Sequence, residues 1–140
     1  MRRVRRITIS EVNFLAYRLA DELMRWDEPI PDFSTRFPNV LESCIETPFQ
    51  TFAGPLYKGL LGKATALFYF MIKNHPFQNG NKRIAVTTLM IFLYKNERWI
   101  KVTNQQLYEF AVKVAESNAT DKAVVMHNID AFLKENIIMR

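Results

Sequence analysis

The side chains with the greatest capacity for chemistry lie close together near the middle of the chain. They form the segment His75-Pro76-Phe77-Gln78-Asn79-Gly80-Asn81-Lys82-Arg83. Pro76 disfavours helical geometry at His75, which predicts that the imidazole stands at the mouth of a loop. Gly80 permits a backbone conformation that a side chain would obstruct, and the next helix begins with unpaired N–H groups that can bind an anion. Because Lys82 and Arg83 add positive charge beside these groups, the segment predicts a phosphate cradle with a histidine at its rim.

Each of these residues also has a structural interpretation. A His-Pro loop with an Asn-Gly pair can serve only to turn the chain, and a Lys-Arg pair can serve only to solvate the start of a helix. The combination of imidazole, glycine, amide and two cations within nine residues favours a site over these interpretations. The glycine spacing and the Lys-Ser/Thr ending of a Walker P-loop are absent. His127, the other histidine, is predicted to be an ordinary helix-face residue, and a zinc site is not expected.

Apolar periodicity and capping residues predict the elements that must position this segment. Ser10 can cap a first helix that ends near Trp26. The predicted apolar face of this helix consists of Val12, Leu15, Ala16, Leu19 and Leu23. Prolines make residues 27–38 an irregular connection.

A short helix is predicted next, because Asn39 and Glu42 resemble a capping box and Pro48 bounds the far end. The residues after it, 47–55, are predicted to be exposed. Strand signals here are limited to a possible hairpin around Phe49–Phe52.

Two buried helices are predicted to flank the candidate site. Pro55 suits the first turn of the helix before it, whose run Leu60–Ile72 is apolar on nearly every side and which should end near Asn74. The helix after it, Asn81–Asn96, is again apolar nearly all round.

Two amphipathic helices are predicted to complete the chain, with Thr103 and Thr120 as their capping residues. Their inner faces are predicted to contain Leu107, Phe110, Ala111 and Val114 in the first helix and Val125, Ile129, Phe132 and Leu133 in the second. A short strand is predicted at Trp99–Val102.

Composition limits the class of protein. The net charge of +5 favours anionic partners, but the four arginines between Arg2 and Arg6 more often form a solvated end than a nucleic-acid site, so nucleic acid is an unlikely partner. The single cysteine, Cys44, excludes an intramolecular disulfide and favours a reducing compartment such as the cytoplasm. The apolar runs Thr65–Ile72 and Ile84–Tyr94 are shorter than the roughly 20 residues of a membrane span, and no signal peptide is recognised.

The nine-residue segment resembles the Fic/Doc motif, which is commonly written His-x-Phe-x-Asp/Glu-Gly/Ala-Asn-Gly/Lys-Arg. The predicted order of helices from about Ile7 to Ile137 also fits that family. The resemblance implies an all-α fold, a Fic/Doc-like helical bundle, in which residues 1–140 form a single domain. It also implies a transferase that moves a nucleotide-derived group to a hydroxyl of a protein.

Matching positions imply individual roles. His75 would be the general base that removes the proton from the target hydroxyl, and Gly80 with neighbouring amides would form an anion hole. The side chains that hold the nucleotide phosphates would be Asn81, Lys82 and Arg83. The place of the family flap, which positions the target segment, is matched by Phe49, Gln50, Thr51, Phe52, Ala53 and Gly54.

Lys82 resembles the death-on-curing (Doc) branch, since adenylyl-transferring members have glycine there and usually a second arginine where this chain has Val86. This implies a toxin that transfers the terminal phosphate of ATP to a Ser or Thr, by analogy in elongation factor Tu. The resemblance also implies a separate antitoxin partner. The self-inhibitory pattern Ser/Thr-x-x-x-Glu-Gly/Asn is not met, because its nearest trace at Ala131–Asn136 lacks the hydroxyl. The alternative activity is that of a protein adenylyltransferase.

Asn79 departs from the motif, because the family has an acidic residue there that holds Mg²⁺. An amide oxygen can bind Mg²⁺ but brings no negative charge, which predicts weaker metal binding. The chain is therefore expected to be either a slow enzyme whose nucleotide carries the metal, or a catalytically impaired Fic-fold binding protein.

Overall fold

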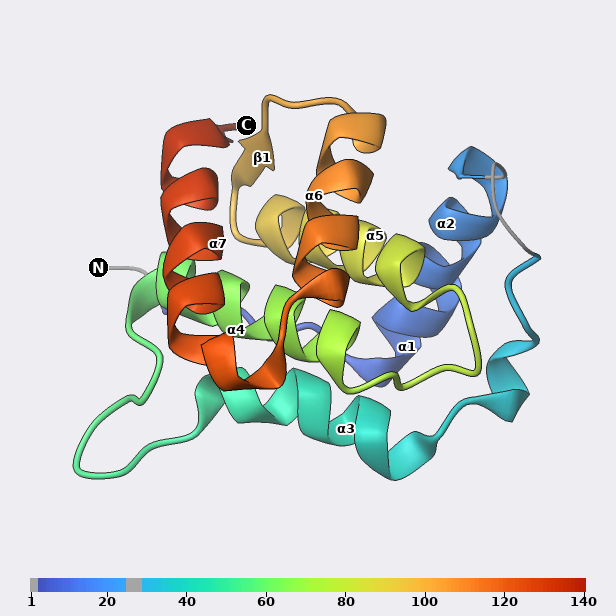
Figure 1. The fold of residues 1–140 in the computed structure, drawn as a ribbon, viewed down its shortest axis with the longest axis horizontal. Coiled ribbons are helices and arrows are strands. Elements are labelled where there is room, and N and C mark those ends of the chain that lie inside the picture. Colours follow the sequence, from blue (N-terminus) through green and yellow to red (C-terminus); the bar gives the residue numbers. More distant parts are fainter. Residues whose placement is uncertain (1–2, 25–28) are drawn as a thin grey trace.

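The computed structural model describes residues 3–24 and 29–140. Figure 1 shows a bundle of helices with α4 (Gly59–Lys73) and α5 (Asn81–Lys95) in its middle. Both helices are buried over most of their surface, as expected for helices that are apolar nearly all round. The predicted all-α helical bundle is confirmed. Within the described residues, no helix is both long and apolar enough to cross a membrane.

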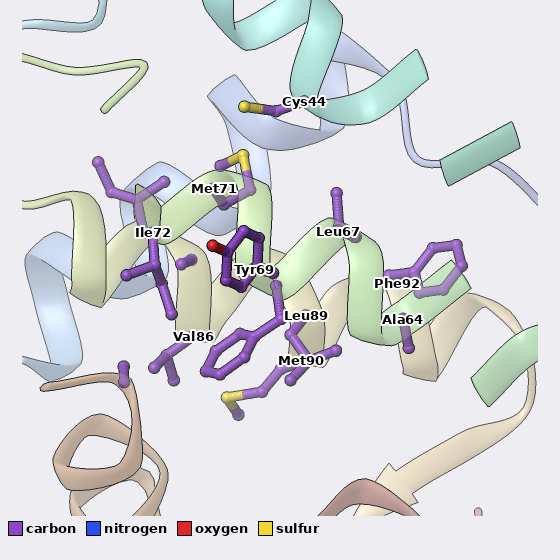
Figure 2. Packing of buried hydrophobic residues seen from close by; sticks show 14 of the residues in the cluster. Cys44, Ala64, Leu67, Tyr69, Met71, Ile72, Val86, Leu89, Met90 and Phe92 are labelled. Carbon is purple, nitrogen blue, oxygen red and sulfur yellow. The ribbon is translucent and has the colours of Figure 1, made fainter. Parts of the chain in front are cut away.

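Side chains from both central helices form the core between them. Figure 2 shows side chains of this core, in which Leu67, Met71 and Ile72 from α4 belong to the same buried cluster as Val86 and Leu89 from α5. All of them are at most 2% exposed, so this interface excludes water. Burial of such apolar area is the main stabilising term for the pair of helices that flank the motif segment.

The N-terminal helix packs along α5 and consists of three parts. These are α1 (Ile9–Glu11), a π-helical stretch η1 (Val12–Tyr17) and α2 (Arg18–Leu23). Thr8, and not Ser10, caps the helix, because the Thr8 hydroxyl accepts from the Glu11 N–H and the Glu11 carboxylate accepts from the Thr8 N–H. The predicted helix end near Trp26 lies outside the described residues.

The buried face of this helix differs from the predicted one. Leu15 is 45% exposed and Leu23 is 48% exposed. The buried residues instead recur at every fourth position, as Val12, Ala16, Ala20 and Met24. The prediction was wrong at these two leucines because a π turn holds more residues than an α turn, so the face shifts along the helix.

Among the described residues, the predicted irregular connection is confirmed for 29–37, apart from the 3-10 turn η2 (Phe33–Thr35). Helix α3 (Pro38–Glu46) follows, with Pro38 in its first turn and Phe37 as N-cap. The predicted capping box at Asn39 was therefore wrong, because proline at the first helical position starts the helix two residues earlier. The 3-10 turn η3 (Thr47–Phe49) then ends this part of the chain.

Residues Gln50–Leu56 are exposed, and the predicted hairpin is reduced to an isolated bridge between Thr51 and Pro55. Pro55 does not open α4, which begins four residues later at Gly59. The prediction was wrong because the chain turns once more, with Gly59 at a positive φ of 65°, before the helix starts.

The C-terminal part contains α6 (Asn104–Glu116) and α7 (Lys122–Asn136). Thr103 caps α6 in a capping box, as predicted. Thr120 does not cap α7, because it lies inside a 3-10 turn, η4 (Ala119–Asp121), that Asn118 caps. The predicted inner faces are confirmed, and they meet where the Phe110 ring stacks on Phe68 and on Phe132, with ring centroids 6.2 and 4.1 Å away.

A two-stranded antiparallel sheet ties the chain end to α5. Strand β1 (Arg98–Ile100) pairs with β2 (Ile137–Met139), with Trp99 opposite Ile138. The predicted strand at Trp99–Val102 thus begins and ends earlier, and its partner β2 was missed because it continues a helical apolar pattern.

Candidate functional site

The motif segment joins the two central helices. Helix α4 ends at Lys73 with Asn74 as its C-cap, and α5 begins at Asn81, so the connecting loop spans residues 74–80. His75 has a φ of +52° and Gly80 a φ of +73°. A left-handed conformation at a histidine is uncommon and costs backbone energy, which tertiary contacts must offset. Helix α4 ends before Pro76, at Lys73, close to the end near Asn74 that the sequence predicts.

Two contacts of the loop fix its shape. The Phe77 ring is 1% exposed and lies 5.8 Å from the Phe33 ring, so Phe77 anchors the loop inward. The Pro76 carbonyl accepts a hydrogen bond of 2.9 Å from the Phe37 N–H, at the start of α3. No sequence pattern predicts this second contact, because it joins backbone atoms 39 positions apart.

The structure brings six of the predicted site residues to one cavity of about 340 Å³. The exposed His75 lies at this cavity, together with the side chain of Asn79 and the start of α5. The full lining is Ile72, His75, Gln78, Asn79, Gly80, Asn81, Lys82, Arg83 and Ala115. An imidazole and a helix N-terminus therefore face the same space.

The start of α5 has the features of an anion site. Its N-cap is Gly80, no side chain caps it in the described structure, and its first turn contains no acidic residue. The N–H groups of the first turn therefore remain for a ligand. A side chain at Gly80 would be strained by the φ of +73° and tightly packed, since a Cβ there would lie 3.2 Å from Cγ1 of Ile30.

Lys82 and Arg83 differ in their surroundings. Lys82 is half-buried, and across residues 3–24 and 29–140 its ammonium group makes no hydrogen bond or ion pair, so it is available to an anion. Arg83 is only 2% exposed, and its Nη1 donates a 3.1 Å hydrogen bond to the Met24 carbonyl at the end of α2. Arg83 thus reaches the cavity wall while it also ties α5 to α2.

Lys73 supports the part of the cavity wall that Ala115 of α6 forms. Its Nζ donates to the Ser117 carbonyl at 2.5 Å and lies 3.4 Å from the Ala115 carbonyl, at the C-terminal end of α6. A cation at the C-terminal end of a helix donates hydrogen bonds to carbonyls that lack a helical partner. It also interacts favourably with the negative end of the helix dipole. Sequence reasoning missed this role, although a lysine in the last turn of a helix is a common signal for such contacts.

The predicted flap, Phe49–Gly54, does not join the site. It precedes the N-terminus of α4, whereas His75 follows the C-terminus, and a helix of 15 residues is about 22 Å long. Figure 1 shows this segment and the motif loop at opposite ends of α4. None of its residues lines the cavity, and Phe52 is 84% exposed. The sequence expectation was wrong in this respect, because the length of α4 separates the two segments.

The donors for a metal ion are few. Asn79 and Gln78 are exposed at the cavity, and each offers one neutral amide oxygen. Among the described residues, no group of three or more His, Cys, Asp or Glu side chains could hold a metal ion. This donor set fits a Mg²⁺ ion that arrives on nucleotide phosphates and not one held by the protein alone.

Comparison with known proteins adds one match. A family model described as the Fic/DOC family matches residues 8–93, from the N-cap of α1 almost to the end of α5. The matched part includes the motif loop and both central helices. No curated protein and no solved structure matches the chain.

Proposed function

Because the chain belongs to the Fic/DOC family, we propose that it transfers a nucleotide-derived group to a hydroxyl of another protein, and more specifically that it phosphorylates Ser or Thr. One observation carries the proposal: His75 and the uncapped N-terminus of α5 line the same cavity. The imidazole can act on a hydroxyl while the helix end holds phosphate oxygens.

In this reaction His75 takes the proton of the target hydroxyl, and the hydroxyl oxygen attacks the γ-phosphorus of ATP. The bond between the γ-phosphorus and its bridging oxygen breaks, and ADP leaves with the electron pair. The first-turn N–H groups of α5 and the Lys82 ammonium stabilise the charge on the transferred group, which is the main way proteins catalyse phosphoryl transfer. Arg83 adds positive charge from within the cavity wall.

Phosphoryl transfer is favoured over adenylyl transfer by two positions on α5. Lys82, where adenylyl-transferring relatives have glycine, lines the cavity and places a cation beside the helix end. Val86, where those relatives usually have a second arginine, is fully buried in the core and does not line the cavity.

Mg²⁺ is proposed as a companion of the nucleotide. Asn79 and Gln78 would contribute amide oxygens to an ion bound mainly by phosphate oxygens. When bound, the ion neutralises phosphate charge during transfer. Asn79 contributes no charge of its own, and this supports the second candidate, a Fic-fold protein that binds nucleotide with little turnover.

The partners are proposed by analogy with the Doc branch. The target is a protein that presents Ser or Thr, with elongation factor Tu as the first candidate, and a separate antitoxin restrains the activity. Since fold alone does not identify a target, a screen should include other proteins of the translation apparatus.

Intact-mass analysis of candidate targets incubated with this protein, ATP and Mg²⁺ tests the proposal. A phosphoryl mass shift supports it, an adenylyl shift assigns the other branch, and no shift on any target with nucleotide bound supports the binding protein. The matched variants are His75→Ala and His127→Ala, because both histidines are exposed but only His75 lines the cavity.

The His75→Ala variant is expected to lose about a hundredfold or more of the transfer rate with no change in melting temperature, because loss of a general base has this scale and the side chain is exposed. The His127→Ala variant should transfer at the wild-type rate. Equal rates in both variants would remove His75 from the reaction.

A further inference from the structure

Asn81 is the first residue of α5, and its side chain is enclosed between the helix and the motif loop. The residue is only 7% exposed. Its Oδ1 accepts a hydrogen bond of 2.9 Å from the Phe77 N–H, and its Nδ2 donates one of 2.9 Å to the Phe77 carbonyl. The side chain therefore closes the loop on itself through both of its polar atoms.

These two contacts determine which way the amide points. A backbone N–H needs an acceptor and a carbonyl needs a donor, so the atom toward the Phe77 N–H must be oxygen and the other must be nitrogen. Nδ2 also lies 3.5 Å from Nδ1 of His75. The group that faces the δ nitrogen of the imidazole is consequently an N–H donor.

A count of donors then limits what Asn81 can do. The amide has two N–H groups. One is used by the Phe77 carbonyl and the other faces His75, so the side chain has no N–H left for a phosphate oxygen. Only the backbone N–H of Asn81 remains at the helix end for an anion.

We propose that Asn81 is a positioning residue, which closes the motif loop through Phe77 and keeps Nδ1 of His75 unprotonated in the free protein. In a neutral imidazole the hydrogen is then on Nε2. A catalytic role for the His75 imidazole rests on the proposed function. In the free protein His75 presents an N–H donor at Nε2, and it can accept a proton there only as the other tautomer.

That other tautomer places the Nδ1–H opposite the Asn81 N–H, two donors face to face. The contact between Asn81 and His75 must therefore open before Nε2 can act as the base. Asn81 thus links the shape of the loop to the protonation pattern of the reactive histidine.

Nitrogen NMR of the free, labelled protein tests the proposal, because it reports which ring nitrogen carries the hydrogen. At about pH 8.5 histidine side chains are neutral. We expect the pure Nε2–H pattern for His75, whereas the exposed His127 in the same spectrum should show the averaged pattern of both tautomers.

Two variants separate the two contacts of Asn81. Asn81→Asp keeps an acceptor for the Phe77 N–H but replaces the donor to the Phe77 carbonyl and toward His75 with an acceptor. Nδ1 of His75 should therefore gain a hydrogen, while the Phe77 N–H keeps its hydrogen bond and its exchange stays slow. Asn81→Ala removes both contacts, so exchange of the Phe77 N–H should become about tenfold faster or more. Lys82→Ala, a neighbour without these contacts, should change neither signal.

A His75 tautomer like that of His127, or an Asn81→Asp variant in which Nδ1 stays unprotonated, would overturn the proposal. If Asn81→Ala does not fold, Asn81→Asp still decides, because its side chain has nearly the same size. Neither measurement needs nucleotide or a target. Absence of transferase activity would therefore contradict the proposed function, but it would not change the tautomer of His75 or the exchange of the Phe77 N–H.

Discussion

Asn79 is the residue at which physical chemistry predicts a gain from a single substitution. Asn79→Asp adds a negative oxygen to the cavity with almost no change in size, so Mg²⁺ on a bound nucleotide should be held more tightly. The transfer rate should rise, and the Mg²⁺ concentration for half-maximal rate should fall by about tenfold, the equivalent of one additional charged ligand contact.

The rate across a Mg²⁺ titration measures this effect, with peptide mass showing that Asn79 of the wild type has not deamidated. Asn128→Asp, at an exposed position of α7, is the control for added charge. A wild type as fast as Asn79→Asp at every Mg²⁺ concentration would show that the missing carboxylate is irrelevant. Tighter metal binding without turnover would assign the chain to the nucleotide-binding proteins.

Lys82 and Arg83 are neighbours with different expected effects. Lys82→Ala should weaken nucleotide binding and leave the melting temperature unchanged, because the ammonium makes no contact with the described residues. Arg83→Ala should weaken binding by about 1.5–3 kcal/mol and also lower the melting temperature, because it removes the hydrogen bond to the Met24 carbonyl. Calorimetry with nucleotide and thermal unfolding provide the two measurements. An Arg83→Ala protein that melts like the wild type would contradict the structural part of this role.

At the scale of elements, the register of the N-terminal helix against α5 depends on one buried hydroxyl. Thr87 is fully buried, and its Oγ1 donates a 2.6 Å hydrogen bond to the Ala16 carbonyl inside the π-helical stretch η1. A π turn disturbs the regular ladder of helical hydrogen bonds, and side chains from neighbouring helices often bond to carbonyls at such places. The end of the same helix carries the Met24 carbonyl that holds Arg83.

Thr87→Val is therefore expected to lower the free energy of unfolding by about 1–3 kcal/mol, since it leaves a buried carbonyl without this donor. The matched control is Thr88→Val. The Thr88 hydroxyl is equally buried but has no hydrogen-bond partner among the described residues, so this variant should be neutral or more stable. Denaturant unfolding of both proteins measures the difference. Equal effects of the two substitutions would mean that the Ala16 contact contributes little.

At the scale of the whole molecule, Cys44 reports on the integrity of the core. It is fully buried beneath α4, with its Sγ 3.4 Å from the Phe70 carbonyl. Burial raises the pKa of the Cys44 thiol to about 12, in spite of a hydrogen bond with Asn74 that lowers it. The thiolate is the reactive form, so the native thiol should be almost inert at neutral pH.

We expect alkylation of Cys44 at about pH 8 to be more than about a hundredfold slower in the folded protein than in denaturant, where the thiol has its ordinary pKa. Mass spectrometry follows the label. The rate in the folded state then measures how often α3 and α4 separate. Fast labelling without denaturant would show that this part of the core opens readily.

The sequence predicted the features that depend on neighbouring residues. The end of α4 before Pro76, the turn at Gly80 and the cap at Thr103 are all as expected, because each follows from the backbone preferences of one or two residues. The buried faces of α6 and α7 followed from their periodicity. For the candidate site, the local motif from His75 to Arg83 predicted that His75 and the start of α5 would lie next to each other.

Capping and register were less predictable. Several residues can cap the start of a helix, and the choice of Thr8 over Ser10 or of Phe37 over Asn39 depends on small differences in backbone energy. The exposed Leu15 could not be foreseen either, because it lies in a π turn whose Ala16 carbonyl accepts a hydrogen bond from Thr87, 71 positions along the chain.

By itself, then, the sequence determined that two buried helices meet at a loop with an imidazole and an anion-binding helix start, because proline, glycine and apolar runs act locally. Only the tertiary structure decided that Arg83 is buried against the Met24 carbonyl and that Phe49–Gly54 lies at the far end of α4. These are matters of distance in space. The packing angle of helices and the length of α4 set such distances, and no pattern of neighbouring residues encodes them.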